Sequence, residues 1–224
     1  MTRAAWVQGI YPLLNEGTVP LSDFPAYAKS LADLGITVIQ LRIKKADDST
    51  RVDVQRYVLD ALRGWDGLLV IDDRADLAKM AFDARDVSHP AVGLHLGQTD
   101  LSPTLARAIV GPDVIIGLST HGPEDVARAA QEPIDYIGFG PIFATATKAN
   151  PDPVVGLSGL ADATKASRLP VVAIGGIEFA SLADVRAAGA TAAATVSLLW
   201  PTPVSGPADA AFVSRALLAM ETFA

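Results

Sequence analysis

The chain has 224 residues, of which 50% are hydrophobic, and this length suits one larger domain or two small ones. Its net charge of −7 argues against a general surface for nucleic acid or anionic membranes, so an anion must be bound by a few local charges. The absence of cysteine excludes disulfides, thiolate metal ligands and a cysteine nucleophile, and the absence of a leader or a membrane-spanning apolar run predicts a cytoplasmic protein.

Short β-rich runs alternate with helical patterns along the chain. The predicted strands are Gln8–Leu14, Ile36–Arg42, Leu68–Ile71, Val92–Leu96, Val114–Leu118, Tyr136–Phe139, Val171–Ile174 and Ala193–Val196. The predicted helices are Ser22–Leu34, Ser49–Arg63, Ala75–Phe82, one beginning at Ser102-Pro103, Pro123–Ala130, Leu157–Ser167, Ser181–Ala188 and Pro207–Thr222. Residues 83–91 are polar and irregular, and we expect a loop there.

The alternation of strands and helices predicts βαβ units around a parallel sheet. Eight such units favour a closed (β/α)8 TIM barrel formed by residues 1–224 as a single domain. An open doubly wound sheet is the alternative, but no Gly-x-Gly-x-x-Gly pattern opens the first helix. In a barrel, the functional residues lie at the carboxyl ends of the strands.

The second predicted strand ends in polar residues at a spacing of two. Gln40, Arg42 and Lys44 therefore project to the same side, and two cations beside an amide indicate an anion site. The alternative, an exposed strand edge, is disfavoured because strands inside a closed barrel have no edge.

Carboxylates follow the next two strands. Asp72 and Asp73 come after the third and Asp100 after the fourth, so carboxylates from neighbouring strands can hold Mg²⁺, which prefers oxygen ligands. The alternative is that one of them is a helix N-cap. Three carboxylates in one place also repel each other, so we expect at least one raised pKa without metal.

Two further stretches fit phosphate groups. The long loop after the sixth strand carries Thr145, Thr147 and Lys148, which can bind phosphoryl oxygens or can simply be solvated. After the seventh and eighth strands come Gly175-Gly176 and Ser197, where backbone amides can approach a phosphate. The alternative for the two glycines is a plain tight turn.

The histidines are weaker candidates. His121, in the run Ser119-Thr120-His121 after the fifth strand, is either a general acid and base or a loop residue. His95 lies within a strand and is expected to be a packed, hydrogen-bonded core residue.

Taken together, these motifs resemble the thiamine phosphate synthase family. The resemblance runs from about Ile36 to Ser197 and is carried in order by these segments: Gln40-x-Arg42-x-Lys44, Asp73-Arg74, Gly93–Asp100, Gly117–His121, Gly138–Lys148, Ala173–Ile177 and Val196-Ser197. It implies a (β/α)8 barrel and an enzyme that joins hydroxymethylpyrimidine diphosphate to a thiazole phosphate, or its carboxylate form, and releases pyrophosphate. It also implies Mg²⁺ as the cofactor.

The resemblance assigns roles to residues of this chain. It implies that the pyrimidine diphosphate is bound by Gln40, Arg42, Lys44, Asp72, Ser119 and Lys148, of which Arg42, Lys44, Ser119 and Lys148 serve catalysis. It implies that the thiazole phosphate is bound by Thr145, Ala146, Thr147, Gly175, Gly176, Val196 and Ser197. Asp73 and Asp100 would be the metal ligands.

Position 72 departs from the family, which usually has Asn there. We expect Asp72 either to contact magnesium or to turn away and pair with a cation such as Arg74. Two other interpretations remain: a thiazole tautomerase-like isomerase, and a catalytically inactive phosphate-ligand binding or regulatory homologue. The expected partners are small-molecule substrates rather than nucleic acid or membrane, and a homo-oligomer is possible.

Overall fold

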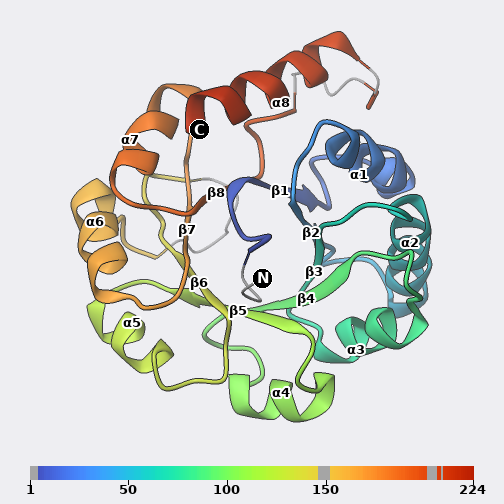
Figure 1. Cartoon of the computed structure of the whole chain (residues 1–224), viewed down its shortest axis with the longest axis horizontal. Coiled ribbons are helices and arrows are strands. Elements are labelled where there is room, and N and C mark those ends of the chain that lie inside the picture. Colours follow the sequence, from blue (N-terminus) through green and yellow to red (C-terminus); the bar gives the residue numbers. More distant parts are fainter. Residues whose placement is uncertain (1–4, 146–151, 201–205, 208) are drawn as a thin grey trace.

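The computed structural model describes residues 5–145, 152–200, 206, 207 and 209–224. Within this part of the chain, eight parallel strands pair in sequence order and β1 pairs with β8, which closes a barrel (Figure 1). The strands are β1 (Gly9–Asn15), β2 (Val38–Arg42), β3 (Leu68–Asp72), β4 (Ala91–Leu96), β5 (Ile115–Thr120), β6 (Tyr136–Phe139), β7 (Val171–Ile174) and β8 (Ala192–Thr195).

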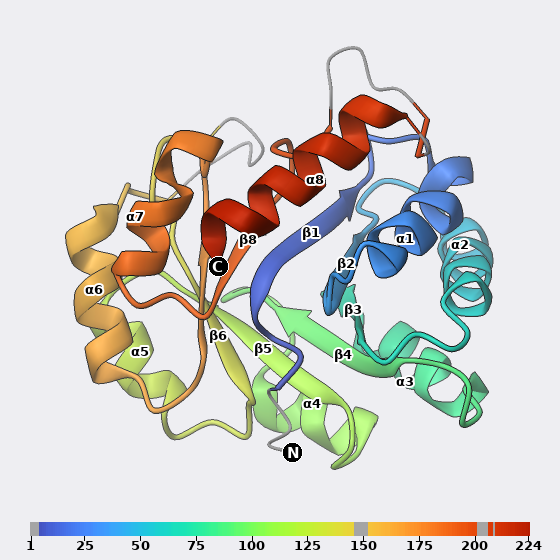
Figure 2. The ribbon, with the colours of Figure 1, turned by 45° about the horizontal axis from the view of Figure 1, so that its top comes forward.

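An outer ring of helices surrounds the strands. The helices are α1 (Phe24–Asp33), α2 (Asp48–Ala61), α3 (Ala75–Ala84), α4 (Pro103–Val110), α5 (Pro123–Ala129), α6 (Gly156–Ala166), α7 (Leu182–Ala187) and α8 (Ala210–Phe223). The last helix, α8, lies against α7 and β1 and completes the ring (Figure 2). The predicted (β/α)8 TIM barrel is therefore confirmed.

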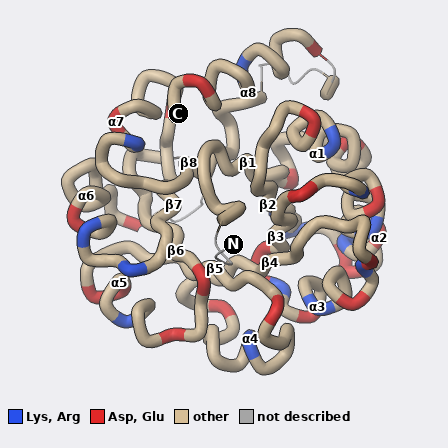
Figure 3. The backbone as a smooth tube through the Cα atoms, viewed as in Figure 1, with Lys and Arg blue, Asp and Glu red and all other residues tan. Residues whose placement is uncertain are grey.

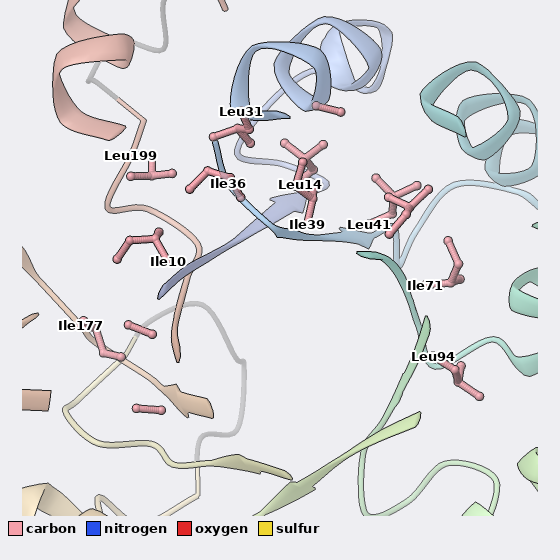
Figure 4. Close-up of a cluster of buried hydrophobic side chains, with 14 of the residues drawn as sticks. Ile10, Leu14, Leu31, Ile36, Ile39, Leu41, Ile71, Leu94, Ile177 and Leu199 are labelled. Carbon is pink, nitrogen blue, oxygen red and sulfur yellow. The ribbon is translucent and has the colours of Figure 1, made fainter. Parts of the chain in front are cut away.

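Residues alternate along each strand between two separate cores. Outward residues such as Leu14, Ile39 and Leu41 pack beneath the helices (Figure 4). Inward residues such as Leu13, Val38 and Val70 fill the barrel. Because both faces of every strand are buried, the strands are continuous apolar runs, as expected of a parallel sheet. Most charged residues lie on the helices and connecting loops (Figure 3).

The observed element ends differ from the predicted ones by a few residues. Asp47, rather than Ser49, caps α2 by accepting a hydrogen bond from the Thr50 amide at 2.8 Å. Helix α3 continues to Ala84, so the predicted loop at 83–91 is shorter. The predicted cap of α4 is correct, because the Ser102 hydroxyl accepts from the Leu105 amide at 3.4 Å.

The strand register sets four residues at one level inside the barrel. Asp72 on β3 is opposite His95 on β4, His95 is opposite Gly117 on β5, and Gly117 is opposite Tyr136 on β6. Side chains from β4 and β6 therefore reach each other across the glycine between them. Among the described helices, none is long and apolar enough to cross a bilayer.

Candidate functional site

The carboxyl end of β2 brings two cations to the barrel mouth. Arg42 donates to the Asn15 side-chain oxygen at 2.6 Å, and its Nε lies 3.6 Å from Asp72 Oδ2. Lys44 Nζ lies 2.9 Å from the same Asp72 oxygen and also contacts Asp73. Gln40, two residues before Arg42 on the same strand, donates to the Tyr11 hydroxyl inside the barrel.

Asp72 is the partner of both cations. Its carboxylate is 9% exposed, and burial, followed by the neighbouring charge of Asp73, raises its pKa to about 6. Asp72 pairs with cations, which is one of its two expected roles, but Arg74 is not among them, because Arg74 pairs with Asp48 at 2.7 Å and with Asp76 at 2.6 Å. The expected rise in pKa is found, but desolvation contributes more to it than repulsion between carboxylates.

Asp73 and Asp100 follow the neighbouring strands β3 and β4, and they are close enough for Asp73 to raise the pKa of Asp100. Asp73 has a φ of 62°, a backbone conformation that is costly for a non-glycine residue and that concentrates at functional sites. Asp100 accepts from the Gly97 amide at 2.7 Å, while burial and then the proximity of Asp73 raise its pKa. Neither residue is a helix N-cap, because those positions belong to Arg74 and Ser102.

These two carboxylates fit a partial Mg²⁺ site. Both supply hard oxygen donors, and a divalent cation would relieve the repulsion that their proximity creates. Within the described residues, no group of three or more His, Cys, Asp or Glu side chains is arranged to enclose a metal ion. A cation held here would therefore need other ligands, such as substrate oxygens or water.

A chain of hydrogen bonds crosses the barrel below the mouth. It runs from the Gln40 amide to the Tyr11 hydroxyl (3.2 Å), to the Tyr136 hydroxyl (3.0 Å), to His95 Nδ1 (3.0 Å), and from His95 Nε2 to the Ser119 hydroxyl (3.0 Å). Burial raises the pKa of both tyrosines and lowers that of His95 to about 4, so all three side chains are neutral at pH 7. His95 is hydrogen-bonded and packed, as predicted, and it also contacts a candidate site residue.

His121 is attached to the loop that follows β6. Its Nδ1 lies 2.6 Å from the Gly140 carbonyl oxygen, its backbone amide donates to Asp125, and its Nε2 lies 3.5 Å from Asp152. These contacts favour the loop-residue interpretation over an acid–base role.

The opposite side of the mouth is formed by the ends of β6, β7 and β8. Gly175 and Gly176 have φ of 101° and 62°, and a Cβ on Gly176 would lie 2.3 Å from the Ala144 carbonyl oxygen. The tight turn is thus required by close packing against Phe143 and Ala144, the two residues before Thr145. Val196 and Ser197 directly follow β8. The candidate residues Ala146, Thr147 and Lys148 lie outside the described residues.

Arg215 on α8 supports this side of the mouth from outside the barrel. Its guanidinium donates to the Leu198 carbonyl at 2.9 and 2.6 Å and lies 4.9 Å from the centre of the Phe179 ring. One side chain thereby connects the segments that follow β7 and β8.

Sequence reasoning missed four residues that position the site: Asn15, Tyr11, Tyr136 and Arg215. Tyr11 and Tyr136 are apolar-looking strand residues in the sequence, and the only signal for them was the glycine at position 117. A Cβ there would lie 2.1 Å from the Tyr136 ring, so the glycine makes room for the phenol.

Fold and site together define a TIM-barrel protein with a cationic and acidic cluster on one side of its mouth and a glycine turn on the other. A family model described as thiamine monophosphate synthase matches residues 10–199. The chain belongs to this family.

Known relatives agree with this assignment. A thiamine-phosphate synthase of Koribacter versatilis is 41% identical over 62% of this chain and 62% of its own length, and one of Synechocystis sp. is 38% identical over 83% of this chain and 51% of its own length. The chain thus spans between half and two thirds of these curated relatives. A solved thiamine phosphate pyrophosphorylase of Pyrococcus furiosus superposes with a TM-score of 0.78 at 26% identity, covering 97% of this chain and 98% of that one.

Proposed function

We propose that this protein is a thiamine phosphate synthase that joins hydroxymethylpyrimidine diphosphate to a thiazole phosphate and releases pyrophosphate. The observation that carries the proposal is the cluster of Arg42, Lys44, Asp73 and Asp100 at the mouth, reached from below by the hydrogen-bond chain that ends at Ser119. Such a cluster suits a diphosphate leaving group attached to a polar ring.

The reaction needs charge stabilisation rather than a protein nucleophile. When the bond to the diphosphate breaks, a pyrimidine methylene cation remains, and the thiazole nitrogen attacks it. Arg42 and Lys44 would hold the diphosphate oxygens and stabilise the negative charge that develops on them. Gln40 and Ser119 would hold the pyrimidine so that its methylene carbon faces the thiazole.

Magnesium belongs to the proposal as a cofactor. Asp73 and Asp100 would hold Mg²⁺, which when bound would neutralise part of the charge on the diphosphate. We also propose that Asp72 contacts the diphosphate. In this structure Asp72 forms ion pairs with Arg42 and Lys44. The diphosphate would therefore compete with Asp72 for the two cations.

The thiazole phosphate would bind on the opposite side, at Thr145, Gly175, Gly176, Val196 and Ser197. The glycine turn supports this placement because it leaves the backbone of the β7 end without side chains. We also assign Ala146 and Thr147 to this phosphate and Lys148 to the leaving diphosphate, on the family resemblance alone.

The test is product formation by the purified protein with both substrates and MgCl₂, with thiamine phosphate and pyrophosphate measured separately. We expect both products in equal amounts. Arg42→Met should reduce the single-turnover rate by about a hundredfold, within the range for removing a charge-stabilising group. The matched control is Arg56→Met, because Arg56 is 61% exposed and pairs with Asp53 on α2. Binding of both substrates without product would instead indicate an inactive homologue.

A further inference from the structure

The donor and the acceptor of each hydrogen bond in the chain inside the barrel can be assigned by starting from Gln40. The Gln40 amide nitrogen can only donate, so the Tyr11 oxygen accepts from it. The 3.0 Å spacing of the two tyrosine hydroxyls permits either of them to donate, and donation by Tyr11 gives its buried hydrogen an acceptor. The Tyr136 hydrogen then has His95 Nδ1 as its acceptor when the imidazole adopts the matching tautomer. Because each hydroxyl has one hydrogen and can donate only once, donation by Tyr11 also determines which atom donates in the following hydrogen bonds.

The direction continues through the imidazole. A neutral imidazole that accepts at Nδ1 carries its hydrogen on Nε2, and that hydrogen is donated to the Ser119 oxygen 3.0 Å away. The Ser119 hydroxyl hydrogen is consequently not used within the chain. It remains available to a ligand in the mouth.

We propose that Tyr11, Tyr136 and His95 are positioning residues that make Ser119 a hydrogen-bond donor toward a heteroaromatic nitrogen of the bound pyrimidine. This inference rests on the proposed function for the identity of the ligand. It adds to it the direction of the contact and the residues that impose that direction.

Burial strengthens the coupling along the inner part of the hydrogen-bond chain, from Gln40 to Tyr136. Gln40 is 3% exposed, Tyr11 1% and Tyr136 0%, so water does not offer these hydroxyls alternative partners. A reversed direction at one position would leave a buried hydrogen without an acceptor, which is costly. These buried hydrogen bonds therefore change direction together rather than one at a time.

Two glycines provide the space that the hydrogen-bond chain needs. Gly117 lies under the Tyr136 ring, and a Cβ on Gly138 would lie 3.2 Å from the His95 ring. The rings of His95 and Tyr136 meet because strand register sets Asp72, His95, Gly117 and Tyr136 at one level. A chance contact between two polar side chains would not need a glycine on β5 and another on β6.

The first test needs no ligand and no activity. The ¹⁵N chemical shifts of His95 in the full-length protein at pH 7 report which ring nitrogen carries the hydrogen. We expect the Nε2–H form, and its replacement by a mixed or Nδ1–H form in Tyr136→Phe, where the donor to Nδ1 is removed. An Nδ1–H form in the unsubstituted protein would overturn the proposed direction.

The second test measures whether Tyr136 acts through Ser119. Calorimetry with pyrimidine diphosphate should give about tenfold weaker binding for Tyr136→Phe, but less than a twofold further loss when the same change is made in Ser119→Ala. Tyr27→Phe, which removes another buried tyrosine hydroxyl, is the matched control and should change binding little.

The proposal would be overturned if Tyr136→Phe weakened pyrimidine diphosphate binding equally in the unsubstituted protein and in Ser119→Ala. A merely structural role for Tyr136 does not depend on Ser119. Inorganic pyrophosphate should bind all variants alike. Binding without product formation would count against the proposed function and not against this inference, since both tests are read without turnover.

Discussion

At the scale of single residues, Asp72 determines how available the two cations are. It lies 2.9 Å from Lys44 Nζ and 3.6 Å from Arg42 Nε, whereas Arg74 has other partners. The structure therefore favours the second of the two roles expected for Asp72, pairing with a cation, although the cations differ from the one named. These ion pairs would have to be exchanged for the proposed diphosphate to bind Arg42 and Lys44.

We predict that Asp72→Asn tightens pyrimidine diphosphate binding about fivefold, because it removes a competing charge worth about 1 kcal/mol. Magnesium affinity should change little, since Asp73 and Asp100 are retained. Calorimetry with each ligand tests this, with Asp83→Asn as the control because Asp83 pairs with Lys79 on the surface of α3. Weaker magnesium binding would instead place Asp72 among the metal ligands.

Gly117 provides the space for the Tyr136 ring, and the hydrogen-bond chain inside the barrel depends on that space. A Cβ at this position would lie 2.1 Å from the Tyr136 ring, so Gly117→Ala must tilt the phenol away from its partners. We expect a loss of about 1–3 kcal/mol in the free energy of unfolding, as for overpacking in a core, and weaker pyrimidine binding. Urea unfolding gives the first quantity and calorimetry the second.

The control for this change is Gly122→Ala, because a Cβ there has no atom within 4 Å. Thiazole phosphate binding should survive in both variants, since the glycine turn after β7 is on the other side of the mouth. If Gly117→Ala left pyrimidine binding unchanged, the Tyr136 contacts would not matter for the ligand.

At the scale of elements, α8 stabilises the side of the mouth where the thiazole phosphate is proposed to bind, and it does so through Arg215. Its hydrogen bonds to Leu198 and its contact with Phe179 connect the segments after β8 and β7. We predict that Arg215→Met weakens thiazole phosphate binding by several fold and leaves pyrimidine diphosphate binding unchanged, because two charge-assisted hydrogen bonds are lost at one side only.

The matched control is Arg186→Met. Arg186 on α7 lies 5.9 Å from the Phe223 ring and donates to the Ala190 carbonyl, away from the mouth. Calorimetry with each substrate separately distinguishes the two outcomes. An equal loss of both substrates in Arg215→Met would indicate a general loosening of the barrel.

At the scale of the whole molecule, burial of His95 makes stability depend on pH. Its folded-state pKa is lowered to about 4 from 6.5, so the unfolded chain binds more protons between these values. The His95 contribution to stability should therefore fall as the pH falls from 6.5 to 4, by at most about 3 kcal/mol, whereas Asp72, whose pKa is raised to about 6, contributes with the opposite sign. Urea unfolding of the unsubstituted protein and of His95→Gln at several pH values tests this, because the difference between their stabilities isolates the His95 contribution and should shrink as the pH falls through that window.

The sequence alone determined the architecture, because its signals are local. Alternating strands and helices, Gly35 after α1 and Ser102 before α4 each depend on nearby residues. The spacing of Gln40, Arg42 and Lys44 likewise placed them on one side, since alternation is a property of the strand itself. Such patterns can be read without knowing which strands are neighbours.

Only the tertiary structure decided which polar groups meet. Residues that are far apart in sequence are brought together in the pairing of Lys44 with Asp72, the proximity of Asp73 to Asp100 and the hydrogen-bond chain through Tyr136. Arg74 and Asp72 are close in sequence yet do not pair, because the end of β3 directs them to different surroundings. Which partner a charged or hydroxyl group finds depends on strand register and closure of the barrel, and these are set by packing across the whole fold.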